Sequence, residues 1–123
     1  MDSPFLWFIN GDRRLTATAR AAIENPDSAL LLSIAALWEV TVKVSMGRLQ
    51  LPARMSEFVR EYVYGNWISL LPVEPQHLDL LQSLPFHHKD PFDRLMIAQA
   101  EAEQIAVVSG DCAFAKYDLP TIW

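Results

Sequence analysis

Two aspartates three residues apart stand directly before an apolar, helix-like run in the stretch HHKDPFDRLMIAQA, residues 87–100. Asp90 suits the N-cap position of a helix whose first residue is Pro91, and Asp93 at the third position resembles a capping box. Capping alone would therefore explain both acids. Alternatively, Asp93 belongs to a group of carboxylates that binds a divalent cation, because Mg²⁺ and Mn²⁺ prefer oxygen ligands.

Two further acids occupy comparable positions. Asp111 lies two residues beyond the predicted strand IAVVS (105–109), and Glu39 lies in the second turn of the helix that follows the predicted strand ALLLS (29–33). Each has a structural explanation, since Gly-Asp is common in turns and Glu39 can pair with Lys43 at i,i+4. Taken together, three acids that converge on the carboxyl ends of strands favour a metal site.

The elements that would position these acids follow from hydrophobic periodicity and from start and stop residues. Helices are expected at 3–9, 16–25, 34–47, 55–66, 75–84 and 91–104. Strands are expected at 29–33, 67–73, 105–109 and 119–123. Thr16 and Ser33 are the expected N-caps of two helices, which Pro26 and Gly47 end. Strands that alternate with helices predict an α/β fold with a mostly parallel sheet covered on both faces, in a single domain over residues 1–123.

Composition narrows the class of protein. The chain has 123 residues, 51% of them apolar, and a net charge of −5. Binding nucleic acid through Lys and Arg alone normally requires a basic protein, so a bound cation would have to neutralise phosphates here. The lone cysteine, Cys112, is typical of a reducing cytoplasm. The run ALLLSIAALW is too short to span a bilayer and MDSPFLWFING lacks the features of a signal peptide, so we expect a cytoplasmic protein without membrane contact.

Three segments together resemble the successive blocks of a PIN-domain protein: LLSIAALWEVTVKVSMGRLQLP, HHKDPFDRLMIAQA and SGDCAFAKYDLPTIW. The motifs are loose one by one, but their order and spacing are specific, and the resemblance runs from about Phe5 to Trp123. The closest group is the VapC-like ribonuclease toxins of bacterial type II toxin–antitoxin modules. The resemblance implies a three-layer α/β/α fold, an endoribonuclease that uses Mg²⁺ or Mn²⁺, an RNA substrate, a cognate antitoxin and a homodimer.

In that family an acidic quartet binds the metal ion and hydrolyses a phosphodiester bond in RNA. The catalytic and metal-binding residues that the resemblance assigns here are Glu39, Asp93 and Asp111. The supporting residues are Ser109, which stands where the family often has Thr, the helix cap Asp90, Lys43 and Arg94. His87 and His88 are interpreted as loop residues rather than ligands.

The beginning of the chain departs from the family pattern. The family's first acid ends a first strand, whereas this chain begins MDSPFLWF, so we expect that strand to be missing or truncated. Asp2 is the candidate for the fourth metal ligand. Three hypotheses follow: an active ribonuclease toxin, a catalytically inactive PIN-like protein that retains only its antitoxin-binding and dimerisation surfaces, and a small α/β protein whose acids are helix caps.

Overall fold

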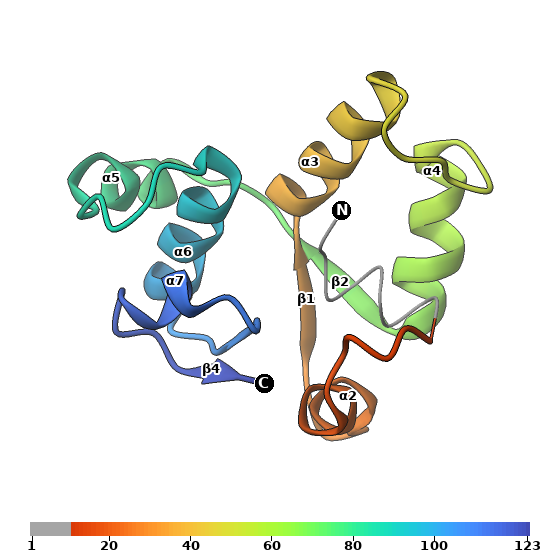
Figure 1. The fold of residues 1–123 in the computed structure, drawn as a ribbon, viewed down its shortest axis with the longest axis horizontal. Coiled ribbons are helices and arrows are strands. Elements are labelled where there is room, and N and C mark those ends of the chain that lie inside the picture. The colour runs from red at the N-terminus through yellow and green to blue at the C-terminus, as the bar shows by residue number, and fades with distance from the viewer. Residues whose placement is uncertain (1–10) are drawn as a thin grey trace. The chain divides into compact units, whose positions relative to one another are not determined.

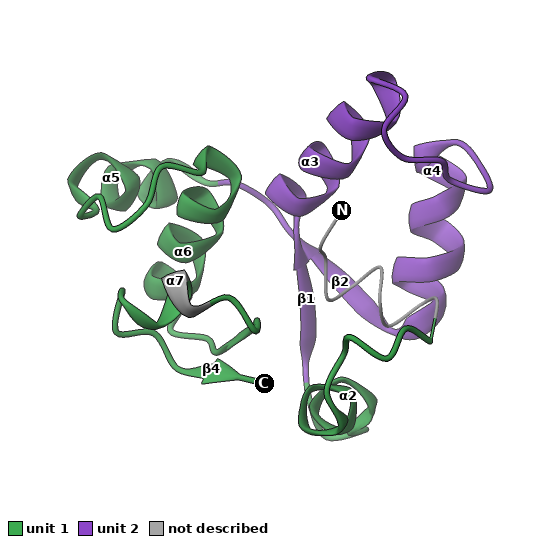
Figure 2. Cartoon of the chain, in the orientation of Figure 1, with its two compact units in different colours: residues 1–28, 74–123 green, residues 29–73 purple. Residues whose placement is uncertain are grey.

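The computed structural model describes residues 11–123, apart from the side chains of Cys112 and Ala113. The helix expected at 3–9, the first strand and Asp2 lie outside the described residues. The chain divides into two compact units, shown in different colours in Figure 2. Unit 2 comprises residues 29–73, and unit 1 comprises the segments on either side of it, 1–28 and 74–123. Each unit is described by itself.

Unit 2 is built on a parallel pair of strands. β1 (Leu30–Ser33) pairs with β2 (Ile68–Leu71) in a register that joins Leu30 to Ile68 and Ser33 to Leu71. Helix α3 (Ile34–Ser45) begins directly after β1, and Figure 1 shows the two elements in sequence. The Ser33 hydroxyl accepts a hydrogen bond from the Ala35 N–H at 3.0 Å, which confirms the predicted N-cap.

The second helical segment between β1 and β2, which follows α3, is confirmed over residues 55–66. Its hydrogen-bonding pattern changes along its length. α4 (Met55–Phe58) runs into a π-helical turn (Val59–Val63) and then a 3₁₀ turn (Tyr64–Asn66). Phe58 and Val63, which are 1% and 0% exposed, lie among the buried residues of this unit. The irregular turns allow both side chains to stay buried although they are five residues apart, a spacing that suits a π turn.

Unit 1 is mostly helical. Its elements are α2 (Ala17–Glu24), α5 (Pro75–Ser83), α6 (Pro91–Glu103), β3 (Val107–Val108), α7 (Cys112–Ala115) and β4 (Thr121–Ile122). The Thr16 hydroxyl accepts a hydrogen bond from the Ala19 N–H at 3.1 Å, as predicted for the start of α2. Helices α5 and α6 pack against each other, and the buried core joins Leu84, Ile97, Phe114 and Tyr117.

A buried histidine, His77, stabilises the N-terminus of α5. The Glu74 N–H donates to Nδ1 of His77 at 2.9 Å, which is one half of a capping box. His77 is 0% exposed, and its Nε2 lies 3.6 Å from Oε1 of Glu103 at the end of α6. This contact joins the first turn of α5 to the last turn of α6.

The α/β class with parallel strands is confirmed, while the strands are shorter and less buried than predicted. In the part of the chain that the structure describes, β1–β2 and β3–β4 form separate two-stranded parallel sheets. The segment 105–109 was expected to be a buried strand, but only Val107 and Val108 are paired and both are half-buried. The length of a strand depends on its partner as well as on local propensity, and β4 offers only Thr121 and Ile122 to this ladder.

Among residues 11–123, the structure contains no helix long and apolar enough to cross a bilayer. The longest described helix is α6, with 13 residues, whereas a span needs about 20.

Asp12, near the start of the described chain, should titrate well below an ordinary aspartate. The Arg14 side chain donates to both of its carboxylate oxygens, Nη2 to Oδ2 at 2.7 Å, and the Arg14 N–H donates to Oδ1 at 2.9 Å. These contacts lower the pKa of Asp12 from 3.8 to about 2. Because the folded-state pKa is depressed, the stabilisation is present above pH 3.8 and is lost as the pH falls toward 2.

An NMR titration of the Asp12 carboxyl carbon, followed in the wild type and in Arg14→Gln, measures this effect. The variant should return the midpoint toward 3.8. A midpoint near 3.8 in the wild type would show that the pair does not persist in solution.

Candidate active site

The start of α6 carries the first pair of candidate acids. The Asp90 carboxylate accepts a hydrogen bond from the Asp93 N–H at 2.9 Å, and Pro91 occupies the first helical position. Asp90 is therefore the N-cap, as the sequence predicted. The same bond fixes the backbone of Asp93 in the first turn of the helix, where the positive end of the helix dipole favours a carboxylate.

The side chain of Asp93 is not the capping group of α6, since the bond to Asp90 uses only its backbone N–H. It is 22% exposed, and its Oδ2 lies 3.7 Å from Nε2 of His88. The position is partly shielded from water yet open enough to reach solvent. A carboxylate in such a place can bind a cation more strongly than one on an open surface, because the surrounding dielectric is lower.

A buried arginine next to Asp93 fixes the loop that precedes α6. Nη1 of Arg94 donates to the Pro85 carbonyl at 2.8 Å, and Nη2 donates to the Leu84 carbonyl at 3.1 Å. The guanidinium also lies 3.8 Å from the centre of the Phe86 ring. Arg94 is 5% exposed, so its role in this structure is to hold the loop that precedes Asp93 rather than to face solvent.

Tyr117, which follows α7, contacts both Arg94 and the loop before α6. Its hydroxyl lies 3.3 Å from Nη1 of Arg94 and 2.9 Å from Nδ1 of His88. It also accepts from the backbone N–H groups of His87 and His88, at 3.2 and 3.3 Å. One phenol oxygen thus joins the loop, α6 and the segment after α7.

Asp111 follows β3 at the carboxyl end of that strand. Its N–H donates to the Ser109 hydroxyl at 3.1 Å, and the Ser109 N–H donates to the Ile122 carbonyl of β4 at 3.2 Å. The intervening Gly110 lies against the Trp123 indole so closely that an added Cβ would stand 2.4 Å from a ring atom. A larger residue at this place, in the turn that presents the exposed Asp111, would therefore force the Trp123 side chain to move.

Glu39 lies on α3, in unit 2. Its Oε2 is 3.6 Å from Nζ of Lys43, which is the i,i+4 ion pair that the sequence allowed. The Glu39 side chain is 19% exposed and that of Lys43 32%, so the pair is half-buried. A cation at Glu39 would compete with Lys43 for the carboxylate.

The predicted acids are divided between the two compact units. Asp93 and Asp111 both belong to unit 1 and Glu39 to unit 2. In the described part of the chain, no group of three or more His, Cys, Asp or Glu side chains is placed to hold a metal ion. The chemistry of the donor set nevertheless suits a hard cation, since all three candidates are carboxylates.

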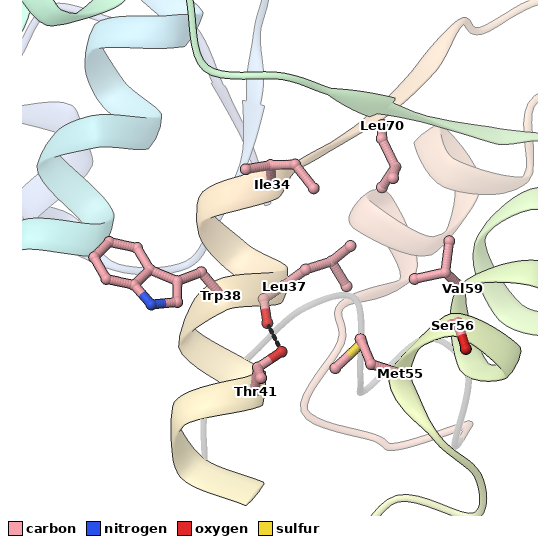
Figure 3. Close-up of a pocket in the computed structure, with 8 residues that line it drawn as sticks. All are labelled: Ile34, Leu37, Trp38, Thr41, Met55, Ser56, Val59 and Leu70. Atoms are coloured by element: carbon pink, nitrogen blue, oxygen red, sulfur yellow. Dashed lines mark hydrogen bonds between the residues drawn. The ribbon is translucent and has the colours of Figure 1, made fainter. Parts of the chain in front are cut away.

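Unit 2 contains an apolar pocket of about 560 Å³, shown in Figure 3. The residues that line it, from α3, α4, the π turn and β2, are Ile34, Leu37, Trp38, Thr41, Met55, Ser56, Val59 and Leu70. The one hydrogen bond drawn there is internal to α3, from the Thr41 hydroxyl to the Leu37 carbonyl at 2.7 Å. Because no lining side chain is charged, this pocket is not suited to acid–base or metal chemistry.

Two residues near Asp93 were not among the predicted site residues. His88 was interpreted only as a loop residue, and it does lie in the loop, but beside Asp93. Tyr117 was not singled out, although it is 7% exposed and contacts both His88 and Arg94. The 29-residue separation between Tyr117 and His88 gave no local pattern that could have joined them.

The fold and its acids define an α/β protein with parallel strands and carboxylates beside a strand end and a helix start. Comparison with known families identifies it further, because the model of the PIN domain matches residues 3–119. The chain therefore belongs to the PIN-domain family, whose members are generally nucleases and often toxins. No curated protein and no solved structure matches the chain significantly.

Proposed function

We propose that this protein is a metal-dependent endoribonuclease of the VapC-like group, acting as the toxin of a toxin–antitoxin module. The observation that carries the proposal is the PIN-domain match over residues 3–119, nearly the whole chain. The position of the Asp93 carboxylate, in the first turn of α6 and not itself the cap, supports it. The match spans both compact units, which supports a single PIN domain over residues 1–123.

In this proposal Asp93, Asp111 and Glu39 hold Mg²⁺ or Mn²⁺. The bound cation would polarise the RNA phosphate, lower the pKa of the attacking water and stabilise the departing oxygen. The contribution of the chain itself is positional: Asp90 and Arg94 fix the start of α6, and the turn at Ser109 presents Asp111. A cation also answers the charge problem, since a chain with a net charge of −5 repels phosphates without one.

The proposed partners are an RNA substrate, a cognate antitoxin and a second copy of the chain in the cytoplasm. Co-expression with the product of an adjacent small gene, followed by purification on a tag carried by this chain, tests the antitoxin. Size-exclusion chromatography with light scattering tests the homodimer.

Millimolar Mn²⁺ should both switch on RNA cleavage and raise the melting temperature of the purified protein. An ion that binds the folded state alone stabilises it, by about 2.7 kcal/mol at a hundred times its dissociation constant. Cleavage of a labelled RNA and a melting curve would each be recorded with Mn²⁺, with Mg²⁺ and with EDTA.

Ca²⁺, a hard cation that accepts more irregular coordination, serves as the control for nonspecific ionic effects. Cleavage that persists in EDTA would contradict metal dependence. A folded protein that cleaves no RNA under any of these conditions would instead favour the inactive PIN-like alternative.

A further inference from the structure

His88 is held in an enclosed position between Tyr117 and Asp93. Its Nδ1 lies 2.9 Å from the Tyr117 hydroxyl, and its side chain is 18% exposed. Its Nε2 is buried, makes no hydrogen bond in the described structure, and lies 3.7 Å from Oδ2 of Asp93. A buried ring nitrogen without a hydrogen bond is costly, so its orientation toward a carboxylate calls for an explanation.

The contacts of Tyr117 determine which nitrogen of His88 carries the proton. The Tyr117 oxygen already faces three donors, the N–H groups of residues 87 and 88 and Nη1 of Arg94. A phenol oxygen has two lone pairs and one O–H, and these three donors already share both lone pairs, so a further donor would find none. The Tyr117 O–H must therefore donate to Nδ1 of His88, the one neighbour in this set that can accept. In the neutral ring the proton then sits on Nε2, which faces Asp93.

We propose that His88 is a positioning residue that orients the Asp93 carboxylate for cation binding through its Nε2–H. The inference rests on the proposed metal-dependent function and extends it to a residue outside the acidic set. At 3.7 Å the contact is longer than a hydrogen bond, but the terminal torsion of an aspartate is soft and a small rotation shortens it.

The chain supplies the parts that such a role needs. A residue that does not touch the metal ion can orient a metal-binding side chain only if its own side chain is fixed. The loss of such a residue typically weakens metal binding 10–100-fold. The His88 ring is fixed by the Tyr117 hydrogen bond and by edge-on contact with the Tyr117 ring, whose centre lies 5.4 Å away. Tyr117 is in turn held by Arg94, which anchors the loop.

The first experiment measures the tautomer directly. Long-range ¹H–¹⁵N correlation spectra of the full chain at alkaline pH, where an imidazole is neutral, should show Nδ1 of His88 as the unprotonated nitrogen and Nε2 as the protonated one. Asp93→Asn should shift the Nε2 resonance while leaving Nδ1 nearly unchanged. A spectrum with the proton on Nδ1 would overturn the proposal, and this readout needs neither a metal ion nor activity.

The second experiment uses two amides that each replace one half of the imidazole. His88→Asn keeps an oxygen for the Tyr117 O–H but has no donor that reaches Asp93. His88→Gln places an amide N–H farther out, near the position of Nε2. Calorimetric titration with Mn²⁺ should show binding weakened 10–100-fold in His88→Asn and restored to within about threefold of the wild type in His88→Gln.

The outcomes separate this inference from the proposed function. Equal Mn²⁺ affinity in His88→Asn and the wild type would overturn the positioning role while the metal site stands. Equal weakening in both variants, in proportion to lower melting temperatures, would show that His88 is merely structural and would also overturn it. A wild type that binds no Mn²⁺ would overturn the proposed function and the positioning role with it, whereas the tautomer would still be decided by the NMR spectrum.

Discussion

Asp93→Asn should reduce metal-dependent RNA cleavage at least about a hundredfold, whereas Asp90→Asn should leave it close to the wild-type rate. A hundredfold loss corresponds to about 2.7 kcal/mol of transition-state stabilisation, which is within what a bound cation contributes. Asparagine has almost the shape of aspartate but is a weaker cation ligand. At position 90 the side-chain oxygen accepts a bond from the Asp93 N–H, and asparagine caps a helix as well as aspartate does.

The matched pair separates the two explanations of the acids in DPFD. If both acids were only structural, neither substitution would change the cleavage rate appreciably. Asp93→Asn would then lose only the stabilisation by the helix dipole, about 0.3–1 kcal/mol of the free energy of unfolding. Melting temperatures of both variants serve as the control, and each should lie within a few degrees of the wild type. Full activity in Asp93→Asn would remove Asp93 from the chemistry and leave it as a residue of the first helical turn.

Arg94→Ala should lower the free energy of unfolding by about 3–4 kcal/mol, a large part of the roughly 5–15 kcal/mol typical of a small protein. The substitution leaves the buried Leu84 carbonyl without its donor, at a cost of about 1–3 kcal/mol, and removes the charge-assisted hydrogen bond to the carbonyl of the exposed Pro85. It also removes the stacking on the largely exposed Phe86 ring, worth about 0.5–1 kcal/mol. Thermal unfolding should show the melting temperature falling on the order of 10 °C or more.

Two variants act as controls for the arginine. Arg94→Lys keeps the charge but lacks the planar fork that reaches two carbonyls at once, so it should lose an intermediate 1–2 kcal/mol, roughly half of the alanine effect. Arg13→Ala, at an exposed position, should change stability by less than about 0.5 kcal/mol. If Arg94→Ala melted within about 3 °C of the wild type, the network around Tyr117 would not be the main support of the loop.

The sequence by itself determined the elements with strong local signals. Thr16, Ser33 and Asp90 were each predicted as N-caps, and all three side chains accept the expected backbone N–H. These signals succeed because a cap involves residues two or three positions apart, so the chain alone brings donor and acceptor together. The α/β class followed from the alternation of such elements.

The tertiary structure decided what depends on pairing and packing between distant residues. The lengths of β3 and β4 are set by their partners, and the sequence of 105–109 carries no record of where pairing stops. Likewise, the sequence placed Arg94 beside a candidate acid, whereas the structure buries its guanidinium against the loop and Tyr117. The contact between His88 and Asp93 depends on Tyr117, which lies 29 residues from His88. Hydrogen-bond networks of this kind form only when separate segments converge, so local periodicity and capping patterns do not encode them.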